Sequence, residues 1–450
     1  MSLPFTPKKK VELEDVVSQL QTQNKMLEHI VQQQQKQQAQ IDQILKQQQQ
    51  LLNLTLTEHS SPDSAALANK WPKPLPNAPG PGAVPRPLLL EGAGGDNPLP
   101  MDKVKVIVTM DGGGFRGLIS IQMLQYFEDM LGVNISEVGD LFGGTSTGGI
   151  LMLGKLNKLS NKDLEIIYKE LGTKVLPVSC KNIRNGSLAN SKLMHGELSK
   201  RFPSSPIRTF LPERRAFVSV CAKKHGLSEP YLPYVLSNYV NETRKLAKGR
   251  SVMSTSGNSF ENISVVDALR ATSAVPLLFE SPKVGDYTFV DGGFKNNNPT
   301  MNAIDEAHDL WGQETHLIII SIGTGRYNSK TIPIEKPKSK KNAMMKKIDT
   351  VTEQITSSIF EQTSVLKTLL DVTNSHQLHK EIKSDLAKHH SANVSYYRFD
   401  PVLSKEISLK DCSDKVISQM RLDTLEFINS AKFQTKFHSL RKELQYINKL

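Results

Sequence analysis

From Val104 onward, short runs of β-branched residues alternate with stretches whose apolar residues repeat at helical spacing. The first run, VKVIVTM, precedes an expected helix over 118–131, and the next, VGDLFGG, precedes an expected helix after Gly148. Further strands are expected at 215–222, 287–293, 315–325 and 393–400. This alternation is typical of βαβ units, because two parallel strands need a long crossover between them. The sequence therefore predicts an α/β fold with a mostly parallel sheet.

The glutamine-rich tail, residues 1–59, has two interpretations. Over 11–56 the apolar residues repeat in heptads, which is the pattern of a helical coiled coil. One seam position holds Leu13, Leu20, Leu27 and Ile41, and the other holds Val17, Val31, Leu45 and Leu52. Polar Asn and Gln residues fill the remaining core slots, so a disordered tail with some helix is the alternative. If the coil forms, the protein is a homo-oligomer or docks on a helical partner.

A proline-rich segment, residues 60–100, follows the tail. It holds ten of the chain's 24 prolines, a composition that favours an extended, semi-rigid linker. The linker separates the tail from a core expected over 101–330. A mainly helical part over 331–450 is expected to complete that core up to about residue 400.

The net charge of +11 favours anionic partners, and both nucleic acid and phospholipid headgroups qualify. Lysines cluster at 8–10 and across 335–347 without the interleaved aromatic residues on which nucleic-acid bases stack. A peripheral membrane surface is therefore favoured as a partner over nucleic acid. The alternative is that the lysines belong to solvated loops.

The cysteine content and the hydropathy indicate a reducing compartment. The three cysteines lie far apart, without a C-x-x-C pair, at Cys180, Cys221 and Cys412. Neither a disulfide framework nor a zinc site is indicated. No apolar h-region follows the basic start of the chain, and no run of about 18 apolar residues occurs. We expect an intracellular protein, cytoplasmic or peripheral to a membrane. The final NKL differs by one residue from the peroxisomal S-K-L signal, which we treat as chance.

The segment MDGGGFRG leads from the first strand into the first helix with the spacing G-x-G-x-x-G. A dinucleotide-binding loop of this kind requires an acidic residue about 20 positions further on, at the carboxyl end of the second strand. Asp140 is near that spacing, but it precedes Leu141 and so lies toward the start or middle of its strand. The favoured interpretation is an oxyanion hole, in which the N–H groups of Gly112, Gly113 and Gly114 converge on a negative oxygen.

The segment LFGGTSTGG contains G-x-S-x-G between a short strand and a helix. Glycines on both sides let the backbone turn sharply, so that Ser146 is presented at the carboxyl end of the strand with a helix N-terminus behind it. Alone, G-x-S-x-G is a weak signal, because Gly-Ser-Thr runs more often form loops. Its position between strand and helix predicts a nucleophile elbow.

A serine hydroxyl needs a base to take its proton, and Asp291 can supply one. It ends the strand pattern YTFVDGG, and if the strands are near neighbours in a parallel sheet their carboxyl ends bring Asp291 and Ser146 to one edge. A β-turn in which Asp291 caps local N–H groups is the alternative. His308 and His316 follow in the order that a Ser-Asp-His triad requires, but both sit in patterns that favour structural roles, as do His195 and His225.

Taken together, the three motifs resemble those of the patatin-like phospholipase family, which includes intracellular calcium-independent phospholipases A2. The motif residues are Asp111, Gly112, Gly113, Gly114, Arg116, Gly117, Gly144, Ser146, Gly148, Asp291, Gly292 and Gly293. The stretches DALRATSAVPLLF, NNNP and SIGTG are similar to that family's pattern as well. The resemblance covers about residues 104–400, so the tail, the linker and the last fifty residues lie outside it.

The resemblance implies a three-layer α/β/α core and a Ser-Asp dyad, with Ser146 as nucleophile and Asp291 as general base. It also implies an oxyanion hole formed by Gly112, Gly113 and Gly114 with Arg116 beside it, unless Arg116 instead ties its loop to a carboxylate. The expected activity is acyl ester hydrolysis of a membrane phospholipid or related glycerolipid. No metal and no cofactor are predicted, since the glycine N–H groups would already stabilise the developing charge.

Two alternatives to this activity stay open. One is a Ser-His-Asp esterase that acts on soluble esters. The other is a catalytically silent scaffold, in which the coiled coil does the work and the core only displays surfaces.

Overall fold

The computed structural model describes residues 103–176, 189–225, 231–241, 260, 262–276, 278–326, 375–389, 393–405, 407 and 411–450. The chain divides into two units, Met1–Gly80 and Pro81–Leu450, and every described residue belongs to the second. The expected coiled coil, the proline-rich linker, the lysine cluster at 335–347 and Cys180 lie outside the described residues.

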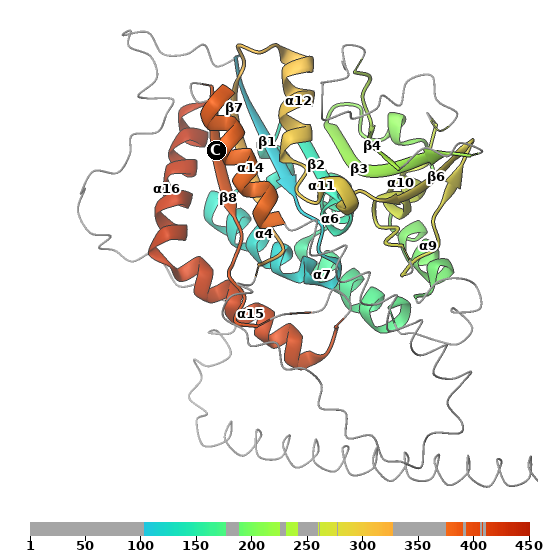
Figure 1. Ribbon diagram of the computed structural model, residues 1–450. Helices are drawn as coiled ribbons and strands as arrows, with labels where there is room; N and C mark the ends of the chain where they lie inside the picture. Colours follow the sequence, from blue (N-terminus) through green and yellow to red (C-terminus); the bar gives the residue numbers. More distant parts are fainter. Residues whose placement is uncertain are drawn as a thin grey trace, which may run out of the picture. The chain divides into compact units, whose positions relative to one another are not determined.

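A single sheet forms the centre of the second unit (Figure 1). Its strands are β1 (Val104–Met110), β2 (Leu141–Thr145), β3 (Arg215–Lys224), β4 (Leu232–Ser237), β5 (Lys283–Val284), β6 (Tyr287–Asp291), β7 (His316–Ile322) and β8 (Val394–Phe399). In the run β3-β2-β1-β7-β8 every neighbouring pair is parallel. The prediction of a mostly parallel α/β sheet is confirmed, and each strand expected from the sequence is present with both ends within three residues of the expected ones.

Strand β6 corrects one expectation, because it runs antiparallel to β3 and not parallel to the central strands. The cause is local: β5 and β6 form a hairpin whose two turn residues are Gly285, with φ of 55°, and Asp286. Tight two-residue turns can join only antiparallel strands. Neither β5 nor β4, which pairs antiparallel with β3, was expected from the sequence.

The register of β3 shows how β2 and β6 are placed. Strand β4 pairs with β3 over 217–222, while β2 pairs over 215–219 and β6 over 220–224. Since β4 occupies one edge of β3 throughout that overlap, β2 and β6 share the other edge, end to end. Their carboxyl ends therefore face each other, with Thr145 opposite Ser219 and Asp291 opposite Val220.

Helices cover both faces of the sheet. They are α4 (Gly117–Leu131), α5 (Ile135–Val138), α6 (Thr147–Leu156), α7 (Asn161–Glu170), α9 (Ser191–Ser199), α10 (Val265–Thr272), α11 (Gly293–Asn296), α12 (Thr300–Trp311), α14 (Ser375–His389), α15 (Asp414–Asn429) and α16 (Ala431–Tyr446). Side chains of α12 and α14 pack on one face, in a buried cluster with Ile107 and Ile319. On the other face Phe127 of α4 contacts Phe399 of β8.

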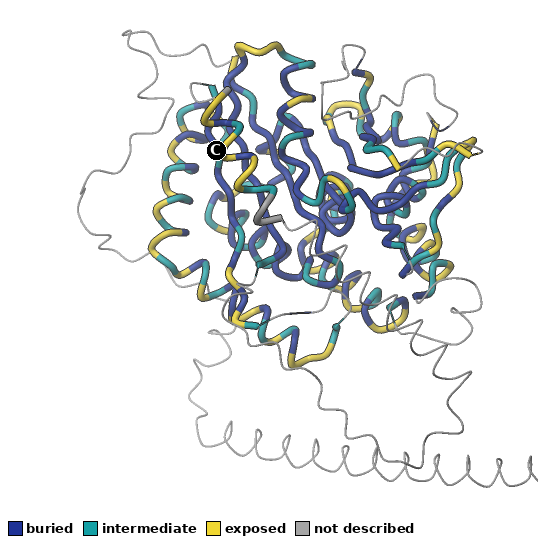
Figure 2. Tube along the Cα trace, viewed as in Figure 1, coloured by how far each residue is buried: buried dark blue, intermediate teal, exposed yellow. Residues whose placement is uncertain are grey.

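The last two helices extend that second face. Phe433 and Phe437 of α16 contact Tyr126 and Phe127 of α4 edge to face or tilted, with ring centroids 5.2–6.1 Å apart. Burial of such aromatic rings is a main source of folding free energy. The chain is buried along the sheet and exposed on the outer sides of α15 and α16 (Figure 2). Across the described ranges, no helix combines the length and the apolar character that crossing a bilayer requires.

Candidate active site

Ser146 occupies the sharp turn between β2 and α6. Its φ of 53° and ψ of −123° are rare for a residue with a side chain, and such strain is typical of functional sites. The two flanking glycines are required by close backbone contacts. A Cβ on Gly144 would lie 2.5 Å from the Gly149 Cα, and a Cβ on Gly148 would lie 2.2 Å from the Met110 carbonyl oxygen. The structure thus contains the strand-turn-helix geometry predicted from G-x-S-x-G.

The turn is held from both sides by hydrogen bonds. The Ser146 carbonyl accepts from the N–H groups of Gly149 (2.9 Å) and Ile150 (3.2 Å), which opens helix α6. The Ser146 N–H donates to Thr272 Oγ1 (2.9 Å), and that hydroxyl donates to the Ser219 carbonyl on β3 (2.6 Å). These bonds fix the backbone from which the Ser146 side chain projects, and only 6% of the residue is exposed.

Asp291, at the end of β6, lines the same cavity as Ser146, and the Ser146 hydroxyl acts on its carboxyl. Burial is the main influence on this carboxyl and raises its pKa from 3.8 to about 7, while the hydrogen bonds from Ser146 and from the Gly293 N–H (2.6 Å) act in the opposite direction. The turn-capping contact that the sequence offered as an alternative is therefore present together with the contact to Ser146. A Cβ on Gly292 would lie 2.1 Å from the Ser219 carbonyl oxygen, so β6 could not approach β3 this closely with a larger residue there.

The glycine loop between β1 and α4 differs from expectation at Gly112. The Gly112 N–H donates to the Asn297 carbonyl (3.1 Å), so this amide already has a protein acceptor. The Gly112 carbonyl accepts from Thr324 Oγ1 (2.9 Å) and from the Asn297 side-chain amide (3.3 Å). Across the described ranges, no acceptor is found for the N–H groups of Gly113 and Gly114. Of the three expected oxyanion donors, only these two have amides without such an acceptor.

Arg116 lies beside this loop, half-buried, and lines the same cavity. Its Nη1 donates to the Gly325 carbonyl (3.2 Å), so the guanidinium ties the glycine loop to the segment after β7. This bond supports the structural role that the sequence offered as an alternative for Arg116, with a carbonyl oxygen as an acceptor.

Ser146 and Asp291 open into a cavity that encloses about 1010 Å³, part of it open to solvent. Gly113, Gly114 and Arg116 lie on its wall beside them. Most of the remaining wall is apolar, including Ile150, Leu171, Val175, Met194, Leu278 and Phe279. Ser146, Asp291 and the glycine loop therefore border a largely apolar space, which suits an uncharged chain attached to a polar reacting group.

The histidines considered for a triad lie elsewhere. His316 begins β7 opposite Val104, at the amino edge of the sheet, and burial lowers its pKa. His308 is buried within α12, and the His225 side chain hydrogen-bonds the Thr288 hydroxyl (2.8 Å). Across the described ranges, no histidine lines the cavity that contains Ser146.

Asp140 directly precedes β2, at the amino end of that strand. Its carboxylate accepts from the Val106 N–H (2.8 Å) and pairs with Lys449 Nζ (2.8 Å). The residue cannot therefore bind a ribose at the carboxyl end of β2, which removes the basis for the dinucleotide interpretation.

Three residues that organise the site were not singled out from the sequence. Thr272 and Thr324 occur inside ATSAVP and SIGTG, so the resemblance of those stretches was a signal for them. Arg398 carried none, since one arginine in the strand pattern NVSYYRFD suggests an exposed position, yet its side chain is 4% exposed.

The chain is similar in sequence to several known phospholipases. Residues 108–304 match the family model described as patatin-like phospholipase. Calcium-independent phospholipase A2-gamma of Mus musculus is 26% identical over 76% of this chain and 41% of the relative. The cGAMP-activated phospholipase of Pseudomonas aeruginosa is 26% identical over 48% of this chain and 62% of the relative. Phospholipase A I of Arabidopsis thaliana is 29% identical over 49% of this chain and 20% of the relative. The chain spans about two fifths of the mouse relative's length.

Proposed function

The chain carries a patatin-like phospholipase domain over residues 108–304, and from this premise we propose that it is a lipid acyl hydrolase that cleaves fatty acyl esters of membrane glycerolipids. The observation that carries the proposal is the placement of Ser146 beside the buried Asp291 on the wall of a largely apolar cavity. A nucleophile paired with a base is what covalent ester hydrolysis requires.

In the first half of the reaction, Ser146 Oγ attacks the acyl carbonyl carbon and its proton passes to Asp291. A carboxylate of ordinary acidity is a poor base, and the raised pKa of Asp291, about 7, supports this assignment because a base is most effective with a pKa near the working pH. The tetrahedral intermediate collapses to an acyl ester on Ser146. The leaving alcohol of the glycerolipid takes the proton from Asp291.

In the second half, Asp291 takes a proton from water, and the hydroxide attacks the acyl carbonyl. The free fatty acid leaves, and Ser146 recovers its proton from Asp291. Atoms balance as one water consumed for each ester cleaved, with no change of oxidation state.

The negative oxygen of both tetrahedral intermediates is assigned to the N–H groups of Gly113 and Gly114. Their lack of a protein acceptor across the described ranges supports this role, and the bond from Gly112 to Asn297 argues against a third donor there. The N–H of Thr147, the residue after the nucleophile at the start of α6, is a further donor in the position that serine hydrolases use. Each such donor is worth about 10²–10³-fold in kcat in serine hydrolases.

The apolar wall supports a fatty acyl chain as the bound part of the substrate, and Arg116 at the wall supports an anionic headgroup near the ester. We therefore favour membrane phospholipids, which the protein would reach from the bilayer surface. The net charge of +11 supports attraction to anionic lipid surfaces.

The test is a fluorophosphonate label followed by lipid hydrolysis. We expect the label on Ser146 and not on Ser273, the other serine at the cavity wall, with loss of labelling in Ser146→Ala. Incubation with phospholipid vesicles should release fatty acids and lysolipids that mass spectrometry identifies. Labelling that persists in Ser146→Ala, or lipid products formed equally by that variant, would contradict the proposal.

A further inference from the structure

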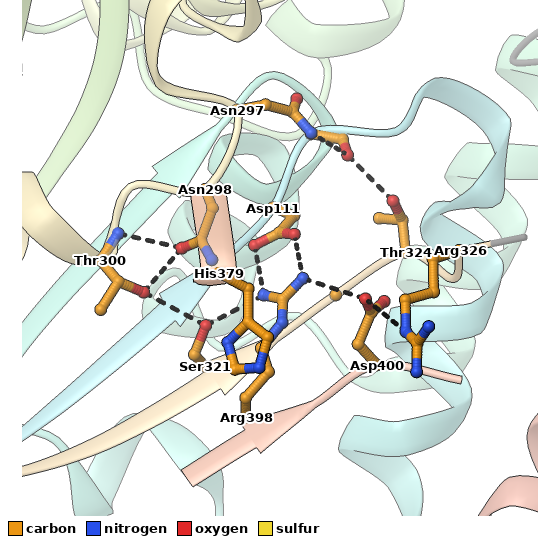
Figure 3. A network of polar contacts seen from close by, with 12 residues as sticks. Asp111, Asn297, Asn298, Thr300, Ser321, Thr324, Arg326, His379, Arg398 and Asp400 are labelled. Atoms are coloured by element: carbon orange, nitrogen blue, oxygen red, sulfur yellow. Dashed lines mark hydrogen bonds and ion pairs between the residues drawn. The ribbon is translucent and has the colours of Figure 1, made fainter. Parts of the chain in front are cut away.

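Asp111 stands between β1 and the glycine loop, directly before Gly112, and is fully buried. Its carboxylate receives two parallel hydrogen bonds from Arg398 of β8, from Nη1 to Oδ1 (2.7 Å) and from Nη2 to Oδ2 (2.5 Å). Figure 3 shows the guanidinium facing the carboxylate at this point. This two-point contact fixes the orientation of the Asp111 side chain as well as its distance.

The register explains how Arg398 of β8 reaches Asp111 across β7. Arg398 pairs with Ser321 of β7, and Ser321 pairs with Thr109 of β1, two residues before Asp111. The Arg398 side chain passes over Ser321, donating to its hydroxyl (3.0 Å), and ends at the start of the glycine loop. The buried, charged side chain of Arg398 therefore crosses β7, the strand that lies between β8 and β1.

Through Asp400, the same guanidinium also contacts the segment whose Thr324 side chain binds the Gly112 carbonyl. Arg398 Nη2 lies 3.3 Å from an oxygen of Asp400, whose other oxygen accepts from the Gly325 N–H (3.0 Å). Gly325 follows Thr324, which donates to the Gly112 carbonyl. Although burial opposes its charge, Arg398 has a pKa raised above the ordinary value by the carboxylates of Asp111 and Asp400. Arg398 thus stays charged. It contacts Asp111, which directly precedes the glycine loop, and Asp400, which binds the segment that holds the Gly112 carbonyl.

We propose that Arg398 is a positioning residue for the glycine loop, acting through Asp111 to hold the Gly113 and Gly114 amides on the reacting oxygen. The inference rests on the proposed function. It makes β8, which lies outside residues 108–304, part of the catalytic module. Displacing amides from an oxyanion by about 1 Å costs on the order of 10²-fold in rate even when the change lies away from the reacting atoms.

The experiment measures kcat and KM for Arg398→Met, Asp111→Asn and the double variant on phospholipid vesicles. If Arg398 acts through Asp111, each single change lowers kcat about 10²-fold with KM little altered, and the double variant is no worse than the singles. Arg398→Lys, which keeps the charge but not the two-point contact, should fall between wild type and Arg398→Met. The proposal would be overturned if the kcat loss of the double variant were the product of the two single losses. A change in KM alone, with kcat unaltered, would overturn it as well.

Glu443→Gln is the matched control. Glu443 of α16 is 2% exposed and accepts a hydrogen bond from Ser395 of β8 (3.2 Å), so the variant tests the change of a buried carboxyl beside β8 and away from the glycine loop. We expect Glu443→Gln to change the melting temperature of the protein and to leave kcat unchanged. If Arg398→Met does not fold, Arg398→Lys and Asp111→Asn decide: wild-type kcat in both would refute the role. If wild type itself neither hydrolyses lipid nor labels at Ser146, the proposed function fails and this inference fails with it.

Discussion

Ser146 and Asp291 lie beside each other where β2 and β6 end facing each other on one edge of β3, and the serine hydroxyl acts on the pKa of the carboxyl. The two residues thus come from strands of opposite direction, and their meeting depends on β3 being longer than β2. Burial of the carboxyl at this junction raises its pKa to about 7.

The pH dependence of hydrolysis should follow Asp291. Only the ionised carboxylate accepts the serine proton, so kcat/KM should rise about tenfold per pH unit below pH 7 and level off above it. Initial rates with an uncharged ester between pH 4.5 and 9 check this. An inflection near the ordinary value of 3.8, or a flat profile, would exclude Asp291 as the base.

Asp291→Asn should lower kcat by about 10²–10⁴-fold, the range for loss of a general base, while stabilising the fold at alkaline pH. A folded-state pKa raised above the unfolded value contributes stability that is complete below about pH 4 and lost as the pH rises through 7. Asparagine at position 291 does not ionise, so the variant does not lose this stability as the pH rises. At about 1.4 kcal/mol per pKa unit, the gain at pH 8 is on the order of 4 kcal/mol.

Urea denaturation at pH 5 and pH 8 measures this gain, with exposed Asp414→Asn as the control for simple loss of charge. The difference in free energy of unfolding between Asp291→Asn and wild type should be larger at pH 8. Equal differences at both pH values would show that the carboxyl is not held in the neutral form by burial.

Exchange of His308, His316, His195 and His225, each to glutamine, should leave kcat within a few-fold of wild type per mole of folded protein. Removing the base of a true triad costs about 10⁴-fold or more, so the two outcomes are well separated. His316→Gln is the informative case for stability, because this residue is 3% exposed. A loss of more than about 10³-fold in any of the four would replace the dyad with a triad.

Gly148→Ala should prevent or severely impair folding. The added Cβ would lie 2.2 Å from the Met110 carbonyl oxygen, and backbone on both sides of the contact leaves little room to relax. Gly196→Ala is the matched control, since a Cβ there meets nothing within 4 Å in helix α9. That change should stabilise the protein by about 0.5–1 kcal/mol. Thermal unfolding of both variants checks the pair, and a stable Gly148→Ala would contradict the packing of the elbow.

Much of the candidate site is encoded in short contiguous stretches. The strand ending at Met110, the glycine loop and the turn at Ser146 were all predicted from neighbouring residues, because backbone sterics restrict which residues can form such turns. Asp291 was placed at a strand end for the same reason. The direction of β6 was mistaken, although the Gly285-Asp286 turn was a local signal for a hairpin.

Only the tertiary structure decided three features of the site. They are the order and direction of the strands, the acceptor of the Gly112 N–H, and the partner of Asp111. Arg398 is 287 residues from Asp111 in the chain, and nothing near either residue identifies the other. The physical reason is that turn conformation depends on steric contacts within a few residues, whereas a buried ion pair forms only once burial and strand register bring distant residues together. The sequence by itself determined the reactive groups and their local backbone, and the folded sheet determined which of them meet.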